Sequence, residues 1–333
     1  MMEIAVVIPT LNRAETLRLT LESLSQVSGI HDDTCQILIV DNGSTDSTRD
    51  VVSEARSRFH RFCYIDNPNP GLHTGRNLGW QSTTADVVAY LDDDVLLSER
   101  WLAGVRSAFK DPAVLLAGGP ILPAFQAPVP NWLMQMWDKQ PLGDRILGEL
   151  SILDLGVVRR IINPFQVFGC NFLVRKRVLE EAQGFHPDGM PQTLLRFRGD
   201  GESYVSALVK ECGGITCYEP DAAVWHQVSE ERTTVDYFER RWFAQGISDS
   251  YTDIRNRQSL KRRIKRALIT LKHLVPDTNP LVCYRGLQRR FRRHWARGYL
   301  FHHWACWKDP LLREWVRQPN YLGTLGRVPQ LKP

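Results

Sequence analysis

Short apolar runs alternate with amphipathic helical segments over residues 3–118, and this alternation limits the chain to few folds. The apolar runs are continuous, several are rich in Val and Ile, and Pro, Gly, Asn or Asp follow most of them. They cover residues 3–9, 36–41, 61–66, 86–91 and 114–117. Continuous runs predict strands that helices cover on both faces, in a mostly parallel, doubly wound sheet. We therefore expect an α/β fold.

The segments between these runs have helical periodicity and short connections. We expect helices over residues 13–26, 44–59, 74–83 and 98–109, and further on over 176–183 and 201–212. Residues 168–175 and 215–218 have the pattern of strands. Between residues 120 and 168 the alternation disappears and proline is frequent, which predicts a long irregular insertion of the functional or mobile kind.

Composition restricts the class of protein further. The chain has 333 residues, of which 43% are hydrophobic and 24% charged, as in a globular protein. It has no uninterrupted run near the ~18 apolar residues of a transmembrane helix, and its first residues lack a signal-peptide pattern. The seven cysteines are odd in number and form no C-x-x-C pair, which argues against a disulfide framework or structural zinc. We expect a cytoplasmic protein with reduced thiols.

The positive charge is concentrated near the C-terminus. Lys and Arg dominate residues 255–297, where Asp277 is the only acid, and tryptophans follow at 304, 307 and 315. A basic amphipathic helix with aromatic residues predicts that residues 255–315 bind an anionic membrane surface peripherally, at the inner face of the plasma membrane. The alternative is a helical cap that packs on the rest of the chain. No nucleic-acid module is recognisable, so we expect no nucleic-acid partner.

Polar residues follow three of the predicted strands. They form the segments Pro9–Asn12, Asp41–Gly43 and Asp92–Asp94. Ligands of open α/β sheets bind at the carboxyl ends of the strands, so these segments can converge on one crevice. There Asp41 can accept hydrogen bonds from a base or ribose. A carboxylate cluster suits Mg²⁺ or Mn²⁺, although three aspartates can also form a solvated turn that caps a helix.

Three further motifs carry polar groups suited to chemistry. The segment Gly71–Gly79 opens a helix and exposes backbone N–H groups to an anion, and its Arg76 can contact a phosphate or a carboxylate. Asp200 and Glu202 begin another helix, where either can act as a general base or complement the helix dipole. His226 is a candidate ligand of a metal or phosphate, or a polar residue without such a role.

Together these blocks resemble the family 2 glycosyltransferases with the GT-A fold. The resemblance covers residues 4 to about 246. It rests on Val7-Ile-Pro-Thr-Leu-Asn12, Ile39-Val-Asp-Asn-Gly-Ser-Thr-Asp46, Asn69-Pro-Gly-Leu-His-Thr-Gly-Arg-Asn-Leu-Gly79, Tyr90-Leu-Asp-Asp-Asp94, Phe168-Gly-Cys-Asn-Phe-Leu-Val-Arg175, Gly184-Phe185, Gly199-Asp-Gly-Glu202 and Trp225-His226. It implies a GT-A domain over residues 1–246, with a donor half of about 1–118 and an acceptor half of about 119–246. Residues 247–333 would form a basic, aromatic-rich helical extension.

The resemblance also implies roles for individual residues. Asp92 and Asp94 match the outer positions of the family's D-x-D motif, so Asp94 would bind a divalent cation, with His226 near the metal or diphosphate. The residues that it implies for donor binding are Pro9, Thr10, Asn12, Asp41, Arg76, Asp92 and Asp93.

The catalytic base is where the chain departs from the family pattern. The family usually has Glu-Asp where this chain has Asp200-Gly201-Glu202, and counting back from Val205 and Gly213 aligns the base with Glu202. Asp200 is the second candidate.

The implied reaction is an inverting transfer from a UDP-, GDP- or dTDP-sugar to a hydroxyl of a glycan or lipid-linked acceptor, in cell-surface polysaccharide synthesis. Two alternatives stay open at this point. They are a metal-dependent nucleotidyltransferase and a non-catalytic, membrane-associated protein that binds nucleotide sugars.

Overall fold

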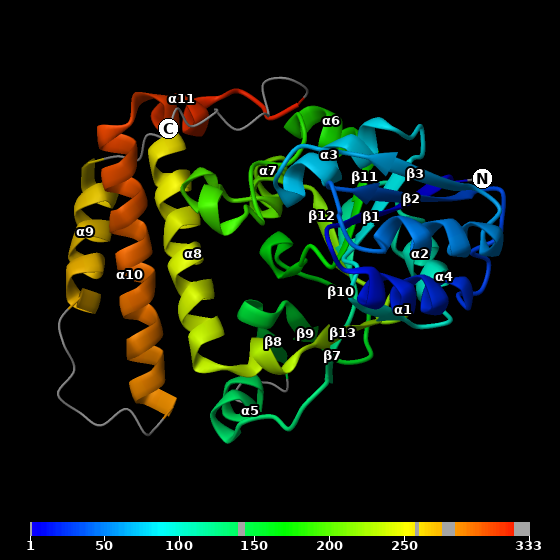
Figure 1. Ribbon diagram of the computed structural model, residues 1–333, viewed down its shortest axis with the longest axis horizontal. Coiled ribbons are helices and arrows are strands. Elements are labelled where there is room, and N and C mark those ends of the chain that lie inside the picture. Colours follow the sequence, from blue (N-terminus) through cyan, green and yellow to red (C-terminus); the bar gives the residue numbers. More distant parts are fainter. Residues whose placement is uncertain (1, 139–143, 257–259, 275–283, 323–333) are drawn as a thin grey trace.

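The computed structural model describes residues 2–138, 144–256, 260–274 and 284–322, which form two sheets with helices around them (Figure 1). The larger sheet has the strand order β10-β12-β6-β11-β4-β1-β2-β3. Its strands are β1 (Ile4–Thr10), β2 (Cys35–Asp41), β3 (Phe62–Asp66), β4 (Val87–Leu91), β6 (Val114–Gly118), β10 (Arg160–Ile161), β11 (Asn171–Arg175) and β12 (Ile215–Tyr218). β4, β1, β2 and β3 run parallel, as the continuous apolar runs predict.

The larger sheet is mixed, because β11 lies antiparallel between β4 and β6. Helices cover both of its faces, so the doubly wound arrangement is confirmed. One face packs against α1 (Ala14–Ser25), α2 (Thr48–Ala55) and α4 (Trp101–Ala108), and the other against α3 (Leu72–Gln81), α6 (Lys176–Ala182) and α7 (Glu202–Glu211). Successive β1 residues alternate between the two cores, with Val6 in the first and Val7 in the second.

A second sheet takes three of its five strands from the region for which the sequence predicts an irregular insertion. Its strands are β5 (Val95–Leu97), β13 (Val224–Val228), β7 (Ile121–Phe125), β9 (Ile152–Asp154) and β8 (Arg145–Leu147), in that order, and α5 (Asn131–Asp138) lies between β7 and β8 in the chain. Several of these strands have only three residues and β7 contains Pro123, so neither run length nor periodicity indicated them.

Short 3₁₀ helices connect several of these elements. They cover Arg56–Arg58, Gly148–Leu150, Pro164–Gln166, Gln192–Phe197 and Glu230–Thr233. The helix expected from residue 98 begins at Trp101, because β5 occupies residues 95–97.

The C-terminal part is helical, as the sequence predicts. It consists of α8 (Val235–Arg255), α9 (Leu260–Leu274), α10 (Tyr284–Lys308) and α11 (Pro310–Arg317). α8 passes without interruption through residue 246, where we expect the domain boundary. α10 lies along α8, on the side away from the sheets (Figure 1). Parts of the predicted membrane-binding region, 257–259 and 275–283, lie outside the described residues.

The helical extension is anchored on the α/β part by buried aromatic residues. Trp315 and Tyr321 pack with Phe197 and Tyr251, and the Trp315 Nε1–H donates to the Phe197 carbonyl oxygen at 2.8 Å. No helix within the described ranges has both the length and the apolar content that crossing a membrane requires.

Candidate active site

The strand ends predicted to converge do meet. Thr10 ends β1, and its hydroxyl donates to an Asp93 oxygen at 2.7 Å across the edge of the sheet. Arg13 lies 3.1 Å from the other Asp93 oxygen. Burial raises the pKa of Asp93 to about 7, with Arg13 partly offsetting this effect. Asp93 is therefore part of the buried connection between β1 and β4.

Asp94 lies in a cationic environment. One of its carboxylate oxygens is 2.8 Å from Arg13 and 3.1 Å from Arg232, and the other is 3.3 Å from His226 Nε2. Burial opposes ionisation, but His226 and the two arginines outweigh it and hold the pKa of Asp94 below its usual range. The pairing of β5 with β13, which sets His226 opposite Val95, brings the two side chains together.

His226 lies within β13 and not after a strand. Its Nδ1 donates to the Leu150 carbonyl oxygen at 2.8 Å, and its Nε2 faces Asp94 and accepts from Arg232 Nη1 at 2.8 Å. Asp94 Oδ1 is buried and accepts no hydrogen bond from the described residues. A carboxylate oxygen and an imidazole nitrogen are both ligands for a divalent cation. Within the described residues, however, three or more His, Cys, Asp or Glu side chains nowhere form a cluster suited to a metal ion.

Arg76 is buried below the aspartate segment and contacts three carboxylates. Its Nη1 lies 2.8 Å from Asp188 and 3.2 Å from Glu202, and its Nη2 lies 3.4 Å from Asp92. Burial raises the pKa of Asp188 to about 7 and that of Asp92 above its usual value, while Arg76 works in the opposite direction. Arg76 thus connects the end of β4 with the start of α7.

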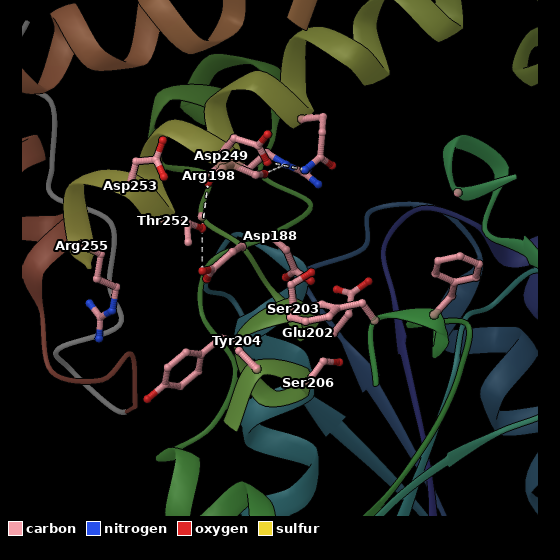
Figure 2. A pocket seen from close by; sticks show the side chains of 18 of the residues that line it. Asp188, Arg198, Glu202, Ser203, Tyr204, Ser206, Asp249, Thr252, Asp253 and Arg255 are labelled. Atoms are coloured by element: carbon pink, nitrogen blue, oxygen red, sulfur yellow. Dashed lines mark hydrogen bonds between the residues drawn. The ribbon is translucent and has the colours of Figure 1, made fainter. Parts of the chain in front are cut away.

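The two candidate bases differ in their hydrogen bonds. Both oxygens of Asp200 have partners, His186 Nδ1 at 2.7 Å and the Thr252 hydroxyl at 2.8 Å. The Glu202 side chain is 31% exposed and faces a cavity of about 880 Å³ between α7 and α8 (Figure 2). Burial raises its pKa, but Arg76, a backbone hydrogen bond and the charges of Arg198 and Arg241 together outweigh burial and keep that pKa below its usual value, so the carboxylate is ionised at neutral pH.

The first two strand ends form a separate polar group. Tyr64 donates to one Asp41 oxygen at 2.7 Å, and the Ser44 backbone N–H donates to the other at 2.8 Å. Asn12 has a φ of +52°, and its side-chain oxygen accepts from the Thr45 backbone N–H at 2.7 Å. Pro9 is a buried β1 residue opposite Val40. These residues shape the ends of β1 and β2.

Sequence reasoning missed four ionisable residues of this site. Arg13 directly follows Asn12 in the first polar segment, which was a usable signal, because the residue next to a strand-end motif lies at the same edge. Asp188, Arg232 and His186 have no local signal. Their partners are 112, 138 and 14 residues away in the chain, so only the tertiary fold brings them together.

The fold and the site define an α/β enzyme with a polar ligand site at the carboxyl ends of its parallel strands. The family model for glycosyl transferase family 2 matches residues 5–182, more than half of the chain. The chain belongs to this family and is a glycosyltransferase that depends on a nucleotide sugar.

Relatives and a solved structure agree with this assignment. The chain is 22% identical to the succinoglycan biosynthesis protein ExoM of Rhizobium meliloti (strain 1021) over 282 residues, 84% of this chain and 85% of the relative. It is 22% identical over 257 residues to a glucosyl-dolichyl phosphate glucuronosyltransferase of Haloferax volcanii, covering 76% and 78%. A mannosyltransferase structure from Pyrobaculum calidifontis, in complex with GDP-Man and Mn²⁺, aligns with a TM-score of 0.54 at 15% identity, over 90% and 87% of the two chains. The GT-A fold is thereby confirmed.

Proposed function

We propose that this glycosyltransferase is inverting and metal-dependent, and that it transfers a sugar from a UDP-, GDP- or dTDP-sugar to an acceptor hydroxyl. The observation that carries the proposal is the position of Arg76. One guanidinium contacts Asp92 on the donor side and Glu202 on the cavity side, at 3.4 and 3.2 Å. An acceptor hydroxyl at Glu202 therefore faces a donor bound along the strand ends. Donor contacts would come from Thr10, Asn12, Asp41, Arg76, Asp92 and Asp93, with Pro9 fixing the end of β1.

Asp94 and His226 would hold the divalent cation. Two observations support this cation site. Asp94 Oδ1 is buried and has no hydrogen-bond partner among the described residues, and His226 Nε2 lies 3.3 Å from it. A bound Mg²⁺ or Mn²⁺ offsets the negative charge that develops on a diphosphate leaving group. The mannosyltransferase of the same fold is in complex with Mn²⁺, which agrees with this choice.

Glu202 is the base of the proposed reaction. It is ionised at neutral pH and exposed to the cavity, whereas both oxygens of Asp200 are already engaged. Glu202 removes the proton of the acceptor hydroxyl as that oxygen attacks the anomeric carbon, from the face opposite the diphosphate. A single displacement of this kind inverts the anomeric configuration. Asp200 then orients the α7 start through His186.

The acceptor we propose is a glycan or a lipid-linked saccharide in cell-surface polysaccharide synthesis. The relative from Rhizobium is named for succinoglycan biosynthesis, and the one from Haloferax for a glucosyl-dolichyl phosphate acceptor. We also propose that the protein meets such an acceptor at an anionic membrane surface, at the inner face of the plasma membrane. Exposed Trp304 and Trp307 near the end of α10 support this, since indole side chains suit a membrane interface.

A donor screen with an Asp94 variant tests the proposal. Nucleotide sugars are screened with Mn²⁺ by thermal shift, because a bound donor stabilises the folded state by mass action. Turnover is then followed by release of a nucleoside diphosphate. We expect Asp94→Asn to abolish metal-dependent turnover, and Asp33→Asn, whose side chain is 84% exposed, to retain it.

Two results would overturn the proposal. One is undiminished turnover in a folded Asp94→Asn protein, which would remove the metal role. The other is diphosphate release from a nucleoside triphosphate without transfer from any nucleotide sugar, which would indicate a nucleotidyltransferase.

A further inference from the structure

The cavity beside Glu202 contains two arginines that the proposed reaction does not use. Arg198 precedes α7, Arg241 lies on α8, and both line the cavity that Glu202 faces. Figure 2 shows Arg198 next to Asp249 of α8, with Asp188 and Glu202 among the other side chains that line the cavity. The two side chains come from parts of the chain that are 43 residues apart.

Both guanidinium groups lack partners for most of their N–H donors. Arg198 Nε donates to the Ser248 hydroxyl at 3.1 Å, and its two terminal nitrogens have no hydrogen bond or ion pair with any residue that the structure describes. Arg241 has none with those residues, and its Nε is buried. The other arginines of the cavity are paired: Arg255 donates to the Val316 carbonyl oxygen and Arg266 to Asp253.

The carboxylates near this pair offset its charge only in part. Glu149, which also lines the cavity, interacts electrostatically with Arg241 but forms no salt bridge with it. Asp188 and Glu202 favour the charged form of Arg198, but both already contact Arg76. Burial and the positive charge of Arg241 lower the pKa of Arg198. Two partly buried cations without partners are costly, and an anion between them would remove that cost. The planar fork of arginine donors matches phosphate and carboxylate oxygens.

We propose that Arg198 and Arg241 bind an anionic oxygen group of the acceptor, a phosphate or a carboxylate, and so select negatively charged acceptors. The inference rests on the proposed function, since Glu202 activates the hydroxyl of the same acceptor. The anionic group would lie in the cavity between α7 and α8 that Glu202 also faces. A neutral saccharide would leave the two arginines without partners and bind more weakly.

Calorimetry on the full chain tests this, with the donor site filled by Mn²⁺ and the nucleoside diphosphate of the active donor. The probes are glucose 1-phosphate, glucuronate and neutral methyl glucoside. We expect at least one anionic probe to bind, and Arg241→Gln or Arg198→Gln to weaken it by about 10- to 100-fold, as for loss of a charge-assisted hydrogen bond. Binding of glucose 1-phosphate alone identifies a phosphate acceptor, and binding of glucuronate alone a carboxylate acceptor.

Arg240→Gln is the matched control. Arg240 is the neighbour of Arg241 on α8, but its side chain is exposed and pairs with Glu231 at 2.6 Å, so this variant should bind the probe like the wild type. Arg241→Lys keeps the positive charge but loses the planar guanidinium group. It replaces the Gln variants in the experiment if those do not fold. It should recover only part of the affinity.

The inference is overturned if the arginine variants bind the anionic probes like the wild type, or if methyl glucoside binds as tightly as either anion. A failure of this inference can be distinguished experimentally from a failure of the proposed function. A wild-type protein that turns over a nucleotide sugar while the arginine variants keep the acceptor KM contradicts only the role of Arg198 and Arg241. A protein that binds no nucleotide sugar contradicts the proposed function.

Discussion

At the scale of single residues, one buried guanidinium organises the site. Arg76 lies among Asp92, Asp188 and Glu202, and these three carboxylates come from the end of β4, the loop before α7 and the first residue of α7. Without a central positive charge, their mutual repulsion would drive these carboxylates apart or raise their pKa values until some of them are protonated. The sequence indicated a residue that contacts a donor phosphate or carboxylate. The structure adds that Arg76 also supports the proposed base.

Replacing Arg76 by methionine should therefore destabilise the fold strongly. Removing one partner of a buried ionic cluster costs about 3–5 kcal/mol, because the remaining charges stay buried without compensation. Urea unfolding followed by tryptophan fluorescence measures the change in the free energy of unfolding. Arg18→Ala, which removes the exposed ion pair with Glu54, is the control and should unfold near the wild-type midpoint. Equal midpoints for the two variants would show that Arg76 does not hold the carboxylates together.

The two candidate bases should respond differently to neutralisation. Glu202→Gln should lower kcat by about 10²–10⁴-fold, since a general base contributes that much. Asp200→Asn should lower kcat less, because its oxygens hold His186 and Thr252 rather than facing the cavity. Steady-state rates with a saturating donor compare the two. A larger loss in Asp200→Asn would transfer the role of base to Asp200.

At the scale of secondary-structure elements, α8 and α10 approach each other through glycine. A Cβ at Gly246 would lie 2.1 Å from the Trp295 carbonyl oxygen, and one at Gly298 would lie 2.0 Å from that of Phe243. Each helix thus has a glycine where the backbone of the other is nearest. This close contact fixes α8 against α10. α8 carries Arg241 and forms one wall of the cavity.

Gly246→Ala should destabilise the protein, although alanine is the better helix former by about 1 kcal/mol. The added methyl group has to displace backbone, and overpacking of this kind costs about 1–3 kcal/mol or more. Gly148→Ala is the control, since its Cβ would meet only the Phe168 ring at 3.9 Å. Thermal unfolding should show a lower Tm for Gly246→Ala alone. An unchanged Tm would mean that the helices separate without cost.

At the scale of the whole molecule, the extension combines a packed side and an exposed side. Trp315 is fully buried against the α/β part, which fits the helical cap that the sequence offered as an alternative. Trp304 and Trp307 are 56% and 73% exposed, and the Lys308 ammonium lies 4.2 Å from the Trp304 ring. Membrane binding and packing as a helical cap are therefore compatible roles for the extension. One side of α10 packs on α8, and the other side is available to a membrane surface.

Vesicle sedimentation tests the proposed membrane contact. The protein should sediment with vesicles that contain phosphatidylglycerol and remain in solution with pure phosphatidylcholine, because basic side chains are attracted to anionic lipid. Raising the salt from about 0.1 to 0.5 M should weaken this binding by screening. Trp304→Ser with Trp307→Ser should reduce it, and Lys110→Ser, an exposed residue that follows α4, should not. Equal binding to both vesicle types would rule out a charge-selective surface.

The amino-acid sequence by itself determined the parallel strands, most of the helices and the polar strand ends. These depend on local properties: run length, periodicity, and the residue types next to a strand. They also sufficed for the family blocks, and the match over residues 5–182 confirms the family that the blocks resemble.

Only the tertiary structure decided what depends on residues far apart in the chain. It paired β5 with β13, which brings His226 to Asp94, and it brought Arg232 to the same carboxylate across 138 residues. It also gave Asp200 and Glu202, two residues apart, different surroundings. Local patterns cannot contain this information, because the charge and burial of a side chain are set by neighbours that the sequence does not place beside it. The three consecutive aspartates illustrate this, since Asp92 pairs with Arg76, whereas Asp93 and Asp94 share Arg13, and only Asp94 also contacts Arg232 and His226.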